Sequence, residues 1–211
     1  IDPAAKALRC LRPPHDLAQK VGTHLGAGEV LQRPLPRPVG QNAFMKNLPL
    51  LPRPLRRLVL VLGDQLWLDN PALAGFDPAQ DAVLMIEAPG EASHVWSHKA
   101  RIALFLSAMR HFQQTLLRKG FALRYVNLDD AALDQPATAS LPARLQHVLT
   151  ELQPQALWLC EAGEWRLQKE IEAAAASAAV PMRTFDDTHF FCSRQRFARW
   201  TQGRKEWRME F

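Results

Sequence analysis

Acidic and amide side chains follow each of the apolar segments that the sequence presents as strands. The first segment, LVLVL at residues 58–62, runs directly into Gly63, Asp64 and Gln65. The later segments run into four further polar stretches, at residues 87–93, 127–130, 161–164 and 186–187. Carboxylates and amide oxygens accept hydrogen bonds from hydroxyl and ring N–H groups, and they also bind cations. The pattern therefore favours a ligand rich in such donors, or a cation, over a phosphate group.

Motifs for several common chemistries are missing from the sequence. It contains neither GxGxxG nor GxxxxGK(S/T), so dinucleotide and P-loop sites lose their main support. His94 and His98 are four residues apart but lack the glutamate of HExxH, and the acidic loops match no defined metal loop. Ser107 has no nucleophile elbow around it. We therefore predict no catalytic residue and no metal ligand.

The acidic residues also have a purely structural interpretation. Asp64 is equally explained as a brace for the turn after the first strand. Glu87 and Glu91 flank a Pro89-Gly90 turn, where solvated loop carboxylates are the usual explanation. The residue pattern alone leaves both interpretations open.

The elements that must position these side chains alternate along the chain from residue 57. Continuous apolar runs indicate strands covered on both faces, and an apolar stripe at helical spacing marks the long helix at 97–119. Ser97 is its candidate N-cap and Gly120 its candidate terminator. The predicted strands are 57–63, 82–88, 121–128, 155–162 and 180–187, and the predicted helices are 97–119, 141–152, 164–179 and 193–203. A short helix or an irregular crossover is expected between the first two strands.

This alternation predicts an α/β fold: a doubly wound, mainly parallel, five-stranded Rossmann-like sheet flanked by helices. In such a sheet, ligands gather beyond the carboxyl ends of the strands, which is where the acidic stretches lie.

Composition and charge limit the possible partners. The chain has 211 residues, with 47% hydrophobic and 22% charged residues, as in an ordinary globular protein. No apolar run is long enough to cross a bilayer, and three cysteines without CxxC spacing favour a cytoplasmic location. The net charge of +5 is uneven, because residues 58–192 carry ten Lys/Arg and sixteen Asp/Glu. Net charge would therefore not draw a polyanion to this central part.

The first 56 residues differ from the rest of the chain. They hold nine of the sixteen prolines and show neither helical nor strand periodicity. We expect residues 1–56 to be a disordered or non-native leader, with Met45 as a candidate natural start. A basic arm for nucleic acid is the alternative, although the aromatic residues typical of single-strand binding are not interleaved here.

A set of motifs in fixed order resembles one known family. The motifs are LVLVLGDQL (58–66), EAPGEASHVWSHK (87–99), SAMRHF (107–112), RYVNLDD (124–130), EAGEWR (161–166) and GRKEWRMEF (203–211). Together they are similar to the N-terminal antenna domain of deoxyribodipyrimidine photolyase-related proteins, the iron–sulfur bacterial branch of the (6-4) photolyase/cryptochrome family. The resemblance covers about residues 57–211, with residues 57–192 as the antenna domain and 193–211 as the start of a linker.

The resemblance implies a flavoprotein with a second, larger helical domain. That domain would hold FAD and a 4Fe-4S cluster and would bind DNA carrying pyrimidine photoproducts. It lies outside this chain, so the fragment alone is expected to be inactive as a lyase. The antenna domain would hold a ribityl-lumazine, and the basic tail at 194–208 would pack on the helical domain rather than on DNA.

The resemblance also implies the site residues. Asp64, Gln65 and Leu66 match the edge of the family's antenna pocket, Glu91 matches a position in the second loop, and Phe105 matches a position that lines the pocket. Phe105 would either stack on the chromophore or fill its space. Two other functions stay open, namely the same domain of a cryptochrome-like blue-light sensor and a stand-alone flavodoxin-like binding domain.

Overall fold

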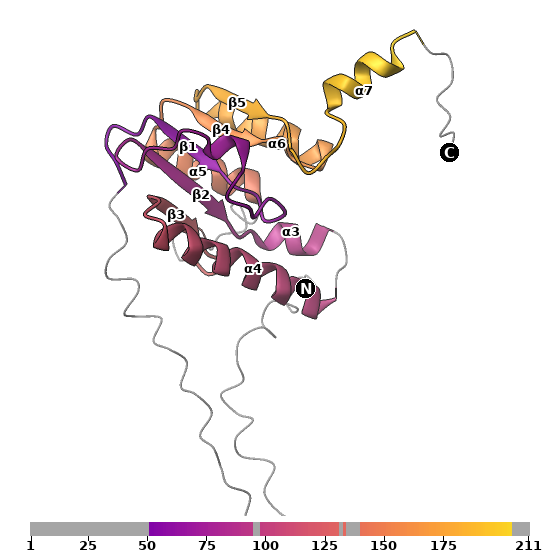
Figure 1. Ribbon diagram of the computed structural model, residues 1–211. Helices are drawn as coiled ribbons and strands as arrows, with labels where there is room; N and C mark the ends of the chain where they lie inside the picture. Colours follow the sequence, from indigo (N-terminus) through magenta and orange to yellow (C-terminus); the bar gives the residue numbers. More distant parts are fainter. Residues whose placement is uncertain (1–50, 95–97, 131–132, 134–139, 204–211) are drawn as a thin grey trace, which may run out of the picture. The chain divides into compact units, whose positions relative to one another are not determined.

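The computed structural model describes residues 51–94, 98–130, 133 and 140–203 of the chain. In this part, five parallel strands form one sheet in the order β3-β2-β1-β4-β5 (Figure 1). The strands are β1 (Arg57–Leu60), β2 (Asp81–Ile86), β3 (Leu123–Val126), β4 (Leu157–Cys160) and β5 (Met182–Phe185). The helices are η2 (Pro71–Leu73, a single 3-10 turn), α3 (Pro89–His94), α4 (Lys99–Arg118), α5 (Leu141–Leu152), α6 (Trp165–Ser177) and α7 (Arg194–Thr201). The predicted five-stranded α/β class is confirmed.

The strand order reverses beside β1. The chain passes from β1 to β2 and β3 on one side, and then returns to β4 and β5 on the other. β1 therefore pairs with β2 and with β4, as Val59 does with Val83 and Trp158. Ligands of open parallel sheets bind at such a reversal, beyond the carboxyl ends of the strands.

Both faces of β1 are buried because its side chains alternate between two apolar clusters. Leu58 and Leu60 belong to the cluster that contains the buried residues of α5 and α6. Val59 belongs to the cluster that contains the buried residues of α4 and η2. The unbroken apolar run in the sequence is thus explained by helices on both sides of the sheet.

Helix α4 packs on the sheet mainly through its C-terminal half. Met109, Phe112 and Leu116 are buried there, whereas Leu104 is 71% exposed and Phe105 is 45% exposed. The N-terminal half is therefore available to line a site beyond the strand ends.

The ends of α4 are defined by His98 and Gly120. The N-cap is His98, whose Nδ1 accepts a hydrogen bond from the Ala100 N–H at 3.2 Å. The predicted cap, Ser97, lies outside the described residues. Gly120 follows the helix with a φ of 81°, as expected for a residue that ends a helix in the left-handed region.

Two short helices connect the strands, one where the sequence predicted a turn and one where it predicted a short helix or an irregular crossover. Helix α3 begins at Pro89, so the predicted Pro89-Gly90 turn is wrong; proline suits the first turn of a helix, where its missing N–H costs nothing. The single turn of η2 lies between β1 and β2, where Asn70 Oδ1 accepts from the Ala72 N–H at 2.9 Å.

A buried arginine of α5 ties together the ends of β2 and β3. The Arg144 guanidinium donates to the carbonyl oxygens of Glu87 and Asn127 at 2.9 and 2.6 Å. It also donates to the carbonyls of Leu128 and Leu133 at 3.1 and 3.2 Å. These carbonyls lie beyond the strand pairing, so Arg144 satisfies buried acceptors that would otherwise lose their solvation.

The predicted leader falls almost entirely outside the described residues, which begin at residue 51. Among the helices that the structure describes, none has the length and apolar character needed to span a bilayer.

Candidate functional site

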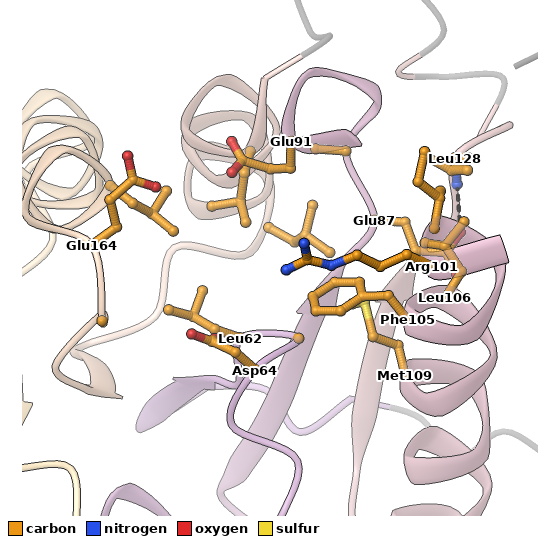
Figure 2. Close-up of a pocket in the computed structure, with 17 residues that line it drawn as sticks. Leu62, Asp64, Glu87, Glu91, Arg101, Phe105, Leu106, Met109, Leu128 and Glu164 are labelled. Carbon is orange, nitrogen blue, oxygen red and sulfur yellow. Dashed lines mark hydrogen bonds between the residues drawn. The ribbon is translucent and has the colours of Figure 1, made fainter. Parts of the chain in front are cut away.

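A cavity of about 380 Å³ lies beyond the carboxyl ends of β1 and β2. Its lining comes from the loops after these strands, from α3, from the N-terminal half of α4, and from the loop that leads into α6 (Figure 2). Most of the lining is apolar, including Leu62, Ile86, Leu106 and Leu128. The charged side chains on its border are Asp64, Glu87, Glu91, Arg101 and Glu164.

Gly63 and Phe105 define the wall between β1 and α4. A Cβ atom added to Gly63 would overlap the Phe105 ring and would lie 2.9 Å from Met109 Sδ. The absence of a side chain at Gly63 therefore lets the ring lie against the turn after β1. Phe105 forms a wall in this position and leaves the cavity open beside it.

Asp64 lies at the rim of the cavity, where its carboxyl faces the loop after β4. A Cβ on Gly163 would lie 3.6 Å from Asp64 Oδ2, an ordinary van der Waals contact. Partial burial raises the pKa of the Asp64 carboxyl above its usual value. The nearby Asp187 carboxylate adds to this increase, while the Asp64 backbone N–H and His189 oppose it. The residue as a whole is exposed, so solvent screens the charge.

Glu87 forms the floor of the cavity and is fully engaged in the fold. Its Oε1 accepts from Arg110 Nε and from the Tyr125 hydroxyl, both at 2.7 Å. Its Oε2 accepts from Arg110 Nη2 at 2.9 Å and from the Leu128 N–H at 3.0 Å. Burial, followed by the bond to Glu87, raises the pKa of Tyr125 far above its usual value.

The prediction that Glu87 is a solvated loop carboxylate is therefore wrong. The residue is 1% exposed, and its partners come from α4, β3 and the loop after β3. Its acceptor positions are occupied by protein donors, so Glu87 holds the floor together rather than binding a ligand.

Two further carboxylates border the cavity from α3 and α6. Glu91 of α3 lies 3.8 Å from Arg166 Nη2, and Glu164, the N-cap residue of α6, lies 2.9 Å from Arg166 Nε. Arg166 also bonds to Glu170 one turn further along α6. One guanidinium thus connects the two helices that form this side of the rim.

Of the five predicted site residues, the structure brings three to the cavity: Asp64, Glu91 and Phe105. Gln65 and Leu66 lie outside its lining. Gln65 is 1% exposed and its Nε2 donates to the Glu161 carbonyl at 2.8 Å, which links the turn after β1 to the end of β4. Leu66 packs against the apolar cluster on the α4 side of the sheet.

Arg101 lines the cavity and was not predicted from the sequence. It lies in the first turn of α4, and Figure 2 shows its side chain extending from that helix into the cavity. The available signal was its spacing of four residues from Phe105, which places both residues on one helix face.

Metal binding finds no support in the described part of the chain. No group of three or more His, Cys, Asp or Glu side chains there is arranged to hold an ion. His98, one of the two histidines considered above, caps α4.

Comparison with known proteins places the chain in a family. The family model described as "Deoxyribodipyrimidine photo-lyase-related protein" matches residues 59–211. A protein of Agrobacterium fabrum (strain C58 / ATCC 33970), named "(6-4) photolyase", is 36% identical over 157 residues. That alignment covers 74% of this chain but only 30% of the relative, so this chain is similar to less than a third of that protein. The chain belongs to the family of deoxyribodipyrimidine photolyase-related proteins.

Proposed function

We propose that the cavity binds an antenna chromophore of the ribityl-lumazine type. The observation that carries this proposal is a cavity of about 380 Å³ at the reversal of strand order, with apolar walls and carboxylates on its rim. Small-molecule sites typically measure about 300–1,000 Å³ and combine apolar lining with a few polar groups. A ribityl-lumazine has flat apolar ring faces, a polyol chain and a polar ring edge, and this lining offers a partner for each.

The proposed contacts divide the residues by chemistry. Asp64 and Glu91 accept hydrogen bonds from the ribityl hydroxyls, because ionised carboxylates are acceptors only. Phe105 and the apolar side chains around it contact the ring faces. Gln65 acts from behind the site by holding the turn after β1 against β4. When bound, the chromophore would absorb near-ultraviolet light and supply the excitation to a flavin.

For the full-length protein we propose light-dependent repair of pyrimidine photoproducts in DNA. The support is the family membership and the similarity to the relative named "(6-4) photolyase". FAD and a 4Fe-4S cluster would belong to a helical domain in the part of such a protein to which this chain is not similar.

Residues 193–211 would begin the linker to that domain. In agreement with this role, α7 has no buried residue and exposes Phe197 and Trp200 at 50% and 45%.

A titration tests the antenna proposal. The purified chain is titrated with dimethyl-ribityllumazine while absorbance and fluorescence are recorded, and we expect saturable binding with a shifted near-ultraviolet band. Asp64→Ala should weaken binding about 10- to 100-fold, the loss expected for a hydrogen bond to a charged group. Asp69→Ala is the matched control, since Asp69 is an exposed carboxylate outside the cavity lining.

Unchanged absorbance and fluorescence of the unsubstituted chain would contradict the proposal. Tighter binding of a flavin mononucleotide than of the lumazine would favour a flavodoxin-like binding domain instead. For the full-length protein, illumination of lesion-bearing DNA separates repair from light sensing, because only a repair enzyme consumes the lesion.

A further inference from the structure

The guanidinium of Arg101, an exposed residue in the first turn of α4, extends into the cavity (Figure 2), and the fold does not use it. Within the residues that the structure describes, its guanidinium makes no hydrogen bond or ion pair. The other arginines near the cavity are engaged, Arg110 with Glu87 and Arg166 with Glu91 and Glu164. A cation directed into a cavity but bound to no protein group suits an acceptor on a ligand.

The distribution of charge in the cavity gives a ligand two different ends. Arg101 enters from α4, while Glu91 lies on α3 and Glu164 caps α6 (Figure 2). Asp64, in the turn after β1, faces the loop into α6. A guanidinium only donates, and its planar fork matches two neighbouring acceptors, whereas the carboxylates only accept. A ligand that satisfies both sides needs an acceptor-rich edge at one end and hydroxyl donors at the other.

A phosphate does not meet this requirement. One guanidinium would attract it, but the carboxylates of Asp64, Glu91 and Glu164 at the rim of the same cavity would repel it. A neutral ring with adjacent carbonyl and imine acceptors, carrying a polyol, meets both demands without placing an anion beside the acidic rim.

We infer that Arg101 determines the specificity of the cavity by binding the pyrimidinedione edge of the chromophore. This inference rests on the proposed antenna function and gives the bound ring a direction. The acceptor edge of the ring lies toward Arg101 and the first turns of α4, and the polyol extends toward Asp64 and Glu91. Phe105, four residues from Arg101 on the same helix face, is then placed to contact the ring.

Binding measurements on Arg101 variants test the inference. Arg101→Gln should raise the Kd for dimethyl-ribityllumazine about 10- to 100-fold, the loss expected for hydrogen bonds from a charged group. Arg101→Lys should recover part of the affinity, because it keeps the charge but loses the fork. Arg118→Gln is the matched control, since Arg118 is exposed on the same helix and lies outside the cavity lining.

Two further readouts separate a ligand contact from a structural effect. The absorption maximum of the bound lumazine should differ between the unsubstituted chain and Arg101→Gln, since a cation at the dione edge perturbs the ring electronically. The losses of binding free energy from Arg101→Gln and Asp64→Ala should add in the double variant, so that the fold-changes in Kd multiply, because the two residues bind opposite ends of the ligand.

The possible failures are distinguishable. Absence of lumazine binding by the unsubstituted chain would refute the proposed function itself. Normal binding by that chain, together with a Kd for Arg101→Gln within twofold of it, would refute only the assignment of Arg101. Losses that fail to add would refute the proposed direction of the ligand.

Discussion

Replacing Glu87 by alanine should destabilise the domain more than any substitution at the rim of the cavity. The change removes the acceptor for the buried Tyr125 hydroxyl and for the Leu128 N–H. Each buried donor left without a partner costs about 1–3 kcal/mol. The two bonds from Arg110 add about 0–1 kcal/mol, because half of the Arg110 side chain is exposed to solvent. We therefore expect the free energy of unfolding to fall by about 2–7 kcal/mol, a large part of the 5–15 kcal/mol typical of a domain.

Urea denaturation followed by tryptophan fluorescence measures this loss. Glu87→Gln should cost less than Glu87→Ala, about 1–3 kcal/mol, because the amide keeps one acceptor oxygen. Glu151→Ala is the control: it removes an exposed carboxylate 4.0 Å from Arg124 and should change stability by about 0.5 kcal/mol at most. A loss below about 1 kcal/mol for Glu87→Ala would refute the conclusion that this carboxylate holds the floor together.

Three further predictions concern other parts of the domain. Gly63→Ala should lower the free energy of unfolding by about 1–3 kcal/mol, because the added methyl group overpacks against the Phe105 ring. In the double variant, Phe105→Ala should relieve part of that cost. Additive losses of unfolding free energy in urea denaturation would contradict the contact. Burial acts to raise the pKa of Asp81, but hydrogen bonds from two arginines and a backbone N–H lower it overall. The stability that this carboxylate provides above the ordinary Asp pKa should therefore be lost as pH falls, and Asp81→Asn should remove that dependence. The same change in the free energy of unfolding with pH for both forms would contradict this. Burial raises the pKa of the Cys160 thiol to about 11, which makes it unreactive in the folded chain. In a chain that carries Cys10→Ser, a thiol reagent should modify exposed Cys192 at once and Cys160 only after unfolding. Equal rates for the two cysteines would refute this.

The sheet and the longer helices were predictable because their signals are local. The apolar run around Val59 indicates a strand covered on both faces, and the same run is buried on both faces in the structure. The predicted helices at 141–152 and 193–203 correspond to α5 and α7, and Ser140 and Ser193 cap them through their side-chain oxygens.

The site was only partly predictable because its side chains depend on partners that are distant in sequence. Whether Glu87 faces solvent or the core depends on Arg110 and Tyr125, which lie 23 and 38 residues further along the chain. Likewise, Gln65 leaves the cavity because its amide reaches the Glu161 carbonyl, 96 residues away. Composition and periodicity carry no information about such pairings, so the acidic edge was predicted while the orientation of its members was not.

The floor and the walls of the cavity differ in how firmly they are held. Glu87 connects α4, β3 and the loop after β3, whereas Phe105 in the N-terminal half of α4 is 45% exposed. The wall around Phe105 is therefore expected to adjust to the size of a ligand, while the floor around Glu87 keeps its position on the sheet. Energy transfer between two pigments depends on the angle between their transition dipoles. A pigment bound as proposed above would keep a constant angle to the sheet, and with it a constant efficiency of transfer to a second pigment held in a fixed position relative to the sheet.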